Sequence, residues 1–288
     1  MSDVRHRAVT VSGHRIFYRE AGPRQAPTVL LLHGYPASSH MFRHLVPALA
    51  DRYHVIAPDH LGFGHSDTPP VDDVDYSFDT LASVTEGLLD AVGVEEFAVY
   101  VQDYGAPIGW RLALAHPERV SAIVSQNGNA YDAGFVEPFW EPIWAYAADP
   151  NPDNEAVLRD ALGWDAIRWQ YTHGVPDPAL VSPDTWTYDH ALFQRPGVEA
   201  AQLRLFADYT SNVALYPRVH EYFRETQVPL LAVWGANDEI FGPDGARAFR
   251  SDLPEVEIHL LDAGHFVLES DFDTAVGYLR GFLGRTLA

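Results

Sequence analysis

The decisive stretch of this 288-residue chain reads Phe97-Ala98-Val99-Tyr100-Val101-Gln102-Asp103-Tyr104-Gly105-Ala106. Its apolar first half is typical of a buried strand, and this run breaks abruptly at Asp103. Gly105 then opens a helical pattern that continues to His116. A strand that turns directly into a helix forces the residue at the bend into a strained conformation and points its side chain out of the sheet edge. The sequence therefore predicts a strand-to-helix elbow with Asp103 at its tip.

Strand-like and helical segments alternate on both sides of this elbow. Two short strands are expected around Val9 and over Arg15–Arg19. Continuous apolar runs predict further strands at Thr28–Leu32, Val55–Ala57, Ala98–Gln102, Ala122–Ser125, Leu230–Trp234 and Ile258–Leu261. Helical patterns occupy His40–Ala50, Ser77–Val92, Ala106–His116, Pro243–Arg250 and Asp273–Leu287. Such alternation predicts an α/β fold, with a mostly parallel sheet that helices cover on both faces.

The alternation stops between Tyr131 and Tyr216, where strand patterns are scarce and aromatic residues and prolines are frequent. We interpret residues 131–216 as a helical lid, inserted into a core that residues 1–130 and 217–288 form. An insertion at the carboxyl edge of a parallel sheet would cover the crevice in which ligands bind. The alternative is a packing appendage without a role in binding.

The composition excludes several classes of function. The formal net charge of −21, from 19 basic and 40 acidic residues, opposes binding to nucleic acid and to anionic membranes. The chain has no cysteine, so disulfides, thiolate nucleophiles and cysteine zinc sites are excluded. No apolar run approaches the ~18 residues that a membrane span needs, and no signal peptide is evident. We therefore expect a cytoplasmic protein.

No metal or cofactor site is expected. His40 and His44 are four residues apart, which is a spacing that can bind a metal, but no third ligand lies nearby. A solvated helix face is the better interpretation of this pair. Gly62-Phe63-Gly64 lacks the third glycine of a dinucleotide-binding motif. The expected partner is a small, apolar to moderately polar molecule, bound by a monomer or a homodimer.

Two polar residues in later loops complete a candidate catalytic set. Asp238 follows the strand Leu230–Trp234, where a carboxylate can orient an imidazole, and Glu239 is the fallback acid. His265 follows the next predicted strand. Asp103 would attack carbon without help from a base and form an ester. His265 would then deprotonate the water that attacks this ester, while Asp238 fixes the histidine tautomer. A turn aspartate and a surface histidine are the plainer alternatives.

The motif His33-Gly34-Tyr35-Pro36 follows the strand Thr28–Leu32. Gly34 permits a backbone turn that few other residues can make. The backbone N–H groups of Tyr35 and Tyr104 are placed to stabilise charge on the carbonyl oxygen of the ester, as an oxyanion hole does. A plain turn at the end of a strand is the alternative interpretation.

Over nearly its whole length, the chain resembles the epoxide hydrolase and haloalkane dehalogenase group of α/β-hydrolases. The resemblance rests on His33-Gly34-Tyr35-Pro36, Asp59 with Gly62-Phe63-Gly64-His65-Ser66, Gln102-Asp103-Tyr104-Gly105, Trp234-Gly235-Ala236-Asn237-Asp238 and Gly264-His265-Phe266. It implies the α/β-hydrolase fold and an aspartate nucleophile. The chain order of nucleophile, acid and histidine is also the order that this fold uses.

Three residues depart from the pattern of this group. Val101 stands where the elbow usually has a small residue, often glycine. Tyr104 and Tyr35 stand where dehalogenases carry a tryptophan and a second tryptophan or asparagine, whose N–H groups bind the departing halide. These departures favour epoxide hydrolysis over dehalogenation.

Epoxide opening needs an acid for the ring oxygen, and in the family two lid tyrosines supply it. The lid contains Tyr131, Tyr146, Tyr171, Tyr188, Tyr209 and Tyr216. Tyr209 best resembles the second of the pair, and Tyr146 is our candidate for the first; lid packing is the alternative for each.

The resemblance implies a hydrolase that opens an epoxide to a diol. Hydrolytic dehalogenation is the first alternative. The second is a family member that acts on another kind of substrate, or a binding protein that keeps the scaffold without catalysis. A serine esterase is nearly excluded, because no serine lies midway between two glycines four residues apart.

Overall fold

The computed structural model describes residues 3–287, and an eight-stranded sheet runs through the centre of this part of the chain. The strands are β1 (Arg5–Val11), β2 (His14–Ala21), β3 (Thr28–Leu32), β4 (His54–Pro58), β5 (Phe97–Gln102), β6 (Val120–Gln126), β7 (Leu230–Gly235) and β8 (Glu257–Leu261). Their order is β1-β2-β4-β3-β5-β6-β7-β8. β2 pairs antiparallel with both β1 and β4, and every pair from β4 to β8 is parallel. This sheet confirms the predicted α/β architecture.

The central strands are apolar throughout because both of their faces are covered. Every residue of β3, β4, β5 and β7 is buried. Buried parallel strands need no polar face, which explains the continuous apolar runs in the sequence. Among residues 3–287, no helix combines the length and apolarity that a bilayer crossing requires.

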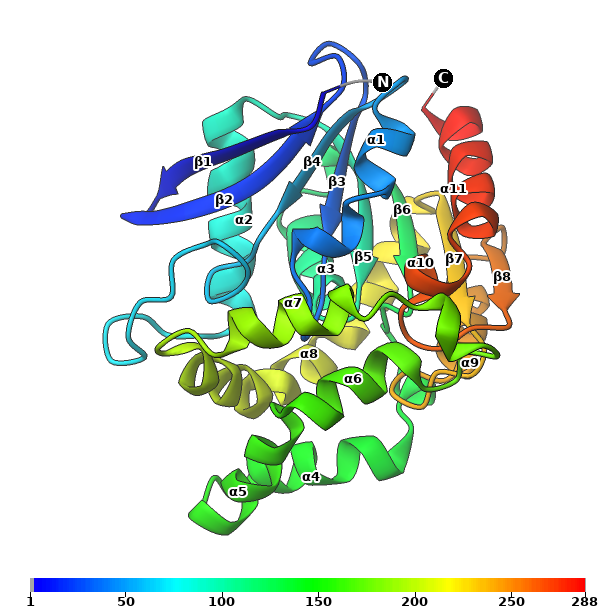
Figure 1. The fold of residues 1–288 in the computed structure, drawn as a ribbon. Coiled ribbons are helices and arrows are strands. Elements are labelled where there is room, and N and C mark those ends of the chain that lie inside the picture. Colours follow the sequence, from blue (N-terminus) through cyan, green and yellow to red (C-terminus); the bar gives the residue numbers. More distant parts are fainter. Residues whose placement is uncertain (1–2, 288) are drawn as a thin grey trace.

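Helices lie on both sides of the sheet (Figure 1). The core helices are α1 (Leu45–Leu49), α2 (Phe78–Val92), α3 (Gly105–Ala115), α9 (Pro243–Ala248), α10 (Val267–Ser270) and α11 (Phe272–Thr286), with single 3₁₀ turns η1 (Ser39–Phe42), η2 (Pro117–Arg119) and η5 (Phe249–Ser251). α2 and α3 pack together on one face, while α1 and α11 pack together on the other.

The predicted helix over His40–Ala50 is wrong as a single element. The structure has the short turn η1 and the separate helix α1. Pro47 explains the break, because a proline inside a helix has no N–H to donate and its ring clashes with the carbonyl four residues earlier, here that of Arg43.

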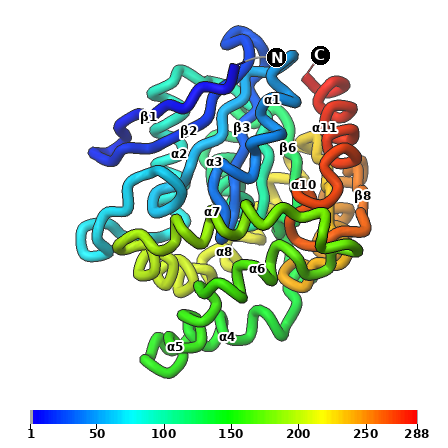
Figure 2. The backbone as a smooth tube through the Cα atoms, in the orientation of Figure 1, coloured from blue at the N-terminus to red at the C-terminus, as the bar shows by residue number. Residues whose placement is uncertain are grey.

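A helical insertion separates β6 from β7. It comprises η3 (Asp132–Gly134), α4 (Glu137–Ala148), α5 (Pro152–Ala161), α6 (Trp164–Thr172), η4 (Pro178–Leu180), α7 (Asp184–Phe193) and the 29-residue α8 (Val198–Thr226). Figure 2 shows α4 and α5 at the opposite side of the molecule from the two ends of the chain. α8 continues through Pro217 and packs on α2 and α3 as well as on α4 and α5, so residues 216 and 217 lie inside one helix.

Two side chains of the insertion fasten it to the core. The ring of Tyr171 stacks on Phe266 at a centroid distance of 3.9 Å, and its hydroxyl donates a hydrogen bond to the buried carboxyl of Asp189. The hydroxyl of Ser38, in the loop after β3, lies 3.5 Å from Asp189. Burial raises the pKa of Asp189 to about 8, so this carboxyl is largely protonated at neutral pH. Phe266 directly follows His265 along the chain, and this contact therefore lies beside the candidate site.

Candidate active site

Asp103 stands at the elbow between β5 and α3 in the left-handed backbone region, with φ of 49°. Few residues other than glycine adopt such a conformation, and it is strained. A Cβ atom on Gly105 would lie 2.2 Å from the carbonyl oxygen of Leu32, so the turn requires glycine there. The carboxylate is 5% exposed. β5 and α3 thus present a buried acid at the carboxyl end of the sheet.

The bulk of Val101 is accommodated by two glycines. A Cβ on Gly109 would lie 2.6 Å from one methyl group of Val101, and a Cβ on Gly128 would lie 3.0 Å from the other. Val101 itself is fully buried. The elbow therefore keeps its close packing, although the small residue is not where the family pattern has it.

Two backbone N–H groups converge on one oxygen of Asp103. The amides of Tyr35 and Tyr104 each donate a hydrogen bond of 2.6 Å to Oδ1. In an ester of Asp103, this atom would be the carbonyl oxygen on which charge develops during hydrolysis. The Tyr35–Pro36 peptide is cis, and a Cβ on Gly34 would collide with the Asp103 side chain at 2.3 Å. The predicted oxyanion donors are therefore in position around a carboxylate that needs glycine as its neighbour.

The imidazole of His265 lies between two carboxylates. Its Nδ1 is 2.8 Å from Oδ2 of Asp238, and its Nε2 is 3.9 Å from Oδ2 of Asp103. The structure thus brings together the three residues that the sequence analysis selected. Glu239, the fallback acid, is largely exposed and pairs with His173 at 3.1 Å instead.

Burial and neighbouring charges shift the pKa values at the centre of the site. Burial raises the pKa of Asp103 to about 6, although His265 and the two N–H donors oppose this rise. Burial alone would lower the pKa of His265, but the carboxylates of Asp238 and Asp103 outweigh it, and the pKa is raised. Asp103 is therefore mostly ionised at neutral pH and remains a more basic carboxylate than one in water.

Three amide side chains that the sequence analysis did not select hold this arrangement. Asn127 donates to Oδ2 of Asp238 at 2.7 Å, and Gln126 donates to the backbone carbonyl of His265 at 2.8 Å. Gln102 contacts His265 Nε2 at 2.7 Å. Gln126 and Gln102 end β6 and β5, and Asn127 directly follows β6. Their position at the carboxyl edge of the sheet is the signal that could have identified them.

His33 braces the turn and does not reach the reacting groups. Its ring is fully buried, with Nδ1 donating to the carbonyl of Gly34 at 3.0 Å and Nε2 accepting from the backbone N–H of His60 at 3.2 Å. Burial lowers the pKa of His33 to about 4. This histidine is therefore neutral at neutral pH and has a structural role.

Tyr209 lies at the centre of an aromatic cluster above Asp103. Its ring centroid is 4.4 Å from Trp140 and 5.9 Å from Tyr104. No hydrogen bond of its hydroxyl occurs within the described residues. Burial, with the charge of Asp103 among the further causes, raises the pKa of Tyr209 well above its usual value. The hydroxyl is therefore protonated and free to donate to a bound molecule.

Tyr146, the other lid candidate, faces away from this cluster. The charged groups that affect its hydroxyl are Glu155, Arg204 and Arg159, and Asp103 is not among them. Trp144, two residues earlier on α4, contacts Tyr209, as Trp140 also does. Two residues correspond to about 200° around a helix, so Tyr146 points to the opposite side. The structure does not bring Tyr146 to the nucleophile.

Tyr35 and Tyr104, which stand where dehalogenases carry their halide donors, differ in the contacts of their hydroxyl groups. The hydroxyl of Tyr35 donates to the carbonyl of Ala161 in the insertion at 2.9 Å. The hydroxyl of Tyr104 is buried and has no hydrogen-bond partner within the described residues. Aromatic rings surround both residues: Phe63, Phe78, Phe193, Phe206 and Tyr209. Such walls suit an apolar ligand with one polar group.

The histidine pair His40 and His44 does not form a metal site. His40 stacks on Tyr188 at 4.3 Å, whereas the ring of His44 contacts Phe272. Within residues 3–287, no group of three or more histidine, aspartate or glutamate side chains is arranged to hold a metal ion.

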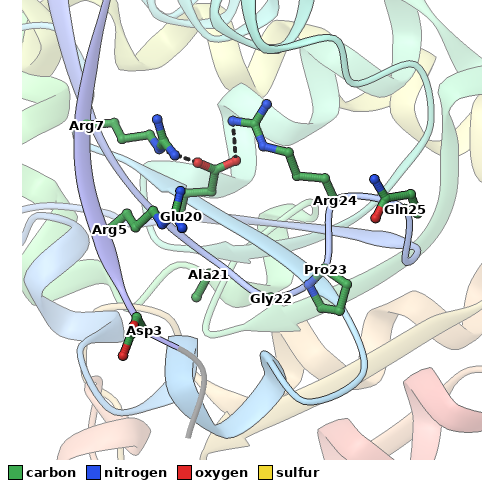
Figure 3. Close-up of a pocket in the computed structure, with 9 residues that line it drawn as sticks. All are labelled: Asp3, Arg5, Arg7, Glu20, Ala21, Gly22, Pro23, Arg24 and Gln25. Atoms are coloured by element: carbon green, nitrogen blue, oxygen red, sulfur yellow. Dashed lines mark ion pairs between the residues drawn. The ribbon is translucent and has the colours of Figure 1, made fainter.

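A surface hollow of about 460 Å³ on the N-terminal hairpin is separate from the site (Figure 3). Arg7 and Arg24 both pair with the buried carboxylate of Glu20, and His54 lies 2.9 Å from the same group. Neither the nucleophile nor the histidine lines this hollow. Its arginines neutralise a buried acid, which is a structural task.

Comparisons with known proteins identify the family of this chain. The profile described as alpha/beta hydrolase fold matches residues 27–272. An uncharacterized hydrolase of Saccharomyces cerevisiae is 44% identical over 92% of this chain and 92% of its own. A haloalkane dehalogenase of Mesorhizobium japonicum is 28% identical over 90% of this chain and 84% of its own. Epoxide hydrolase A of Mycobacterium tuberculosis is 39% identical over a shorter region, 46% of this chain and 41% of its own.

The fold also matches solved structures. Cfl2 of Burkholderia cenocepacia superposes with a TM-score of 0.82 at 26% identity, covering 97% of this chain and 95% of that one. This coverage includes both the sheet and most of the helical insertion. The chain therefore belongs to the α/β-hydrolase fold family, as a hydrolase with epoxide hydrolases and haloalkane dehalogenases among its homologues.

Proposed function

We propose that this protein hydrolyses an epoxide to a diol through an ester of Asp103. The observation that carries the proposal is that the two oxygens of this carboxylate have different contacts. Oδ1 accepts both oxyanion N–H groups, whereas Oδ2 is 3.9 Å from His265 Nε2 and accepts no hydrogen bond within the described residues. One oxygen is thus held and the other is free to attack.

The reaction follows from these positions in two steps. Oδ2 of Asp103 attacks a ring carbon, the carbon–oxygen bond of the epoxide breaks, and the ring oxygen takes the hydroxyl proton of Tyr209. The product of this step is a hydroxyalkyl ester. His265 Nε2 then removes a proton from water, and the resulting hydroxide attacks Cγ of the ester. The charge on Oδ1 is stabilised by the N–H groups of Tyr35 and Tyr104 until the intermediate collapses. The departing diol oxygen then takes the proton from His265, and the proton left on the regenerated Asp103 carboxyl returns to the Tyr209 oxygen.

Hydrolytic dehalogenation is the second candidate. The observation that favours it is the buried hydroxyl of Tyr104, which has no hydrogen-bond partner within the described residues, because a departing halide needs donors inside an apolar wall. A panel of terminal epoxides and matched haloalkanes separates the two reactions. Diol formation without halide release supports the first, and halide release with no turnover of epoxides overturns it.

Replacing Tyr209 with phenylalanine tests the acid. We expect kcat for an epoxide to fall about 100-fold, because a general acid typically contributes 10²–10⁴-fold. The stability should change little, since this hydroxyl makes no hydrogen bond within the described residues. Tyr146→Phe is the matched control and should keep kcat within about threefold. Equal losses in the two variants would contradict the assignment.

The pH dependence of kcat/KM tests the ionisation of Asp103. The attacking form is the carboxylate, so kcat/KM should rise with pH through about 6, the raised pKa of this group. For a carboxyl in water, the midpoint of this rise would lie near pH 4. Initial rates at low substrate concentration between pH 4.5 and 8 locate the midpoint, and a kcat/KM that is already close to its plateau at pH 5 would show that burial does not act on the nucleophile.

A further inference from the structure

Gln102 connects the oxyanion turn with the base. Its side chain is completely buried between β5 and the loops that carry Gly34 and His265. The amide oxygen Oε1 accepts a hydrogen bond of 3.0 Å from the backbone N–H of Gly34. The amide nitrogen Nε2 lies 2.7 Å from Nε2 of His265.

These contacts fix the direction in which the amide of Gln102 points. A backbone N–H can only donate, so the group that faces Gly34 must be the amide oxygen. The NH₂ group then faces His265, whose Nε2 must accept. At its other nitrogen, His265 donates from Nδ1 to Asp238 at 2.8 Å. The geometry describes a neutral imidazole with its lone pair on Nε2.

We propose that Gln102 is a positioning residue that holds His265 in this neutral tautomer until the ester has formed. The inference rests on the proposed function, because only the second step of that reaction uses His265 as a base. A proton on Nε2 would face the NH₂ group of Gln102, donor against donor. Before His265 can accept a proton, the amide of Gln102 must move away from Nε2. The hydrolytic water must then replace it as the hydrogen-bond donor to Nε2.

Gln102 acts against the charges around His265. The charged groups that face this histidine are Asp238, in the loop after β7, and Asp103, at the elbow after β5. Both favour the imidazolium. The aromatic rings that contact this imidazole, those of Phe241 and Phe266, are uncharged. A donor aimed at Nε2 favours the neutral ring and so keeps the base available at a pH where the carboxylates would otherwise protonate it.

Two substitutions of nearly equal size separate this role from packing. In Gln102→Glu, a carboxylate can still accept from Gly34 but also accepts from a protonated Nε2. We expect the acidic limb of the pH–rate profile for ester hydrolysis to move to higher pH by at least about one unit. Ester hydrolysis at pH 7 should slow at least about 10-fold. Gln102→Met removes the donor without adding an acceptor. The acidic limb of its pH–rate profile for ester hydrolysis should therefore also move to higher pH, but by a smaller amount. Single-turnover kinetics measure ester formation and ester hydrolysis separately.

A readout without substrate keeps this inference distinct from the proposed function. Nitrogen-15 NMR of histidine-labelled protein reports whether Nε2 carries a proton, and the His265→Gln spectrum identifies the signal. Wild type should show an unprotonated Nε2 to a lower pH than either Gln102 variant, with Gln102→Glu shifted furthest. If His265 titrates at the same pH in all three proteins, the inference is overturned. Failure to form any ester, with these shifts present, would instead count against the epoxide proposal alone.

Discussion

Asp103→Asn should lose turnover by about 10⁴-fold or more and yet unfold at a higher temperature than the wild type. The loss follows because the amide cannot attack carbon as a carboxylate does, and removal of a nucleophile leaves only binding and the oxyanion donors to catalyse the reaction. Steady-state turnover of an active epoxide measures it. Retention of activity within tenfold of wild type would refute the assignment of Asp103.

The gain in stability has its origin in the raised pKa of Asp103. The pKa is about 6 in the folded protein against 3.8 for an ordinary aspartate. A raised pKa means that folding opposes ionisation, so its contribution is fully favourable below pH 4 and is lost as the pH rises through 6. The difference corresponds to roughly 3 kcal/mol at neutral pH. Asparagine carries no charge and also tolerates the positive φ of the elbow.

Thermal unfolding at two pH values tests this explanation. Asp103→Asn should exceed wild type in Tm by several degrees at pH 7.5, and the difference should shrink markedly at pH 4, where both side chains are neutral. An Asp103→Asn protein that is less stable than wild type at pH 7.5 would show that the buried charge is well compensated.

His265→Gln should trap the ester that Asp103 forms. The first step needs no base and survives, whereas the second loses the group that activates water, so the adduct accumulates. Intact-mass measurement after mixing with an active epoxide should show protein heavier by the mass of one substrate. Overall turnover should fall by at least about 10³-fold.

The matched control for this experiment is the double variant Asp103→Asn/His265→Gln. It keeps the same substitution at the base but has no carboxylate to alkylate, so it should show no added mass. An adduct on this double variant would place the modification on another residue. Wild type that turns over in ¹⁸O-water should incorporate the label into Asp103 during single turnovers.

The order of the strands and helices could be predicted because the buried strands of this sheet are easy to recognise in the sequence. β3 and β5 are buried on both faces and therefore read as unbroken apolar runs. The helix over residues 40–50 could not be placed correctly by periodicity alone, because one proline divides it. α10 has only four residues, which is too short for a helical period to be visible.

The candidate site likewise contains some residues that the sequence identifies and others that only the folded structure reveals. Asp103, Asp238 and His265 lie in loops after strands, and parallel strands bring such loops to one edge of the sheet. Tyr146 shows what the sequence lacked: position along a lid does not specify which side of a helix faces the nucleophile. The amide of Gln102 adjoins Asp103, but its hydrogen bonds depend on folded loops that are 68 and 163 residues away.

Val101 shows that the space needed at a tight bend can be left by different residues in different chains. The space that a small residue would normally leave before the acid is supplied from the side, by Gly109 on the following helix and Gly128 beyond the next strand. A search that demands a glycine two positions ahead of the acid would pass over this chain. A search for the summed volume of the three positions would find it, and it would also predict that any relative with a larger residue at 109 or 128 carries a smaller one at 101.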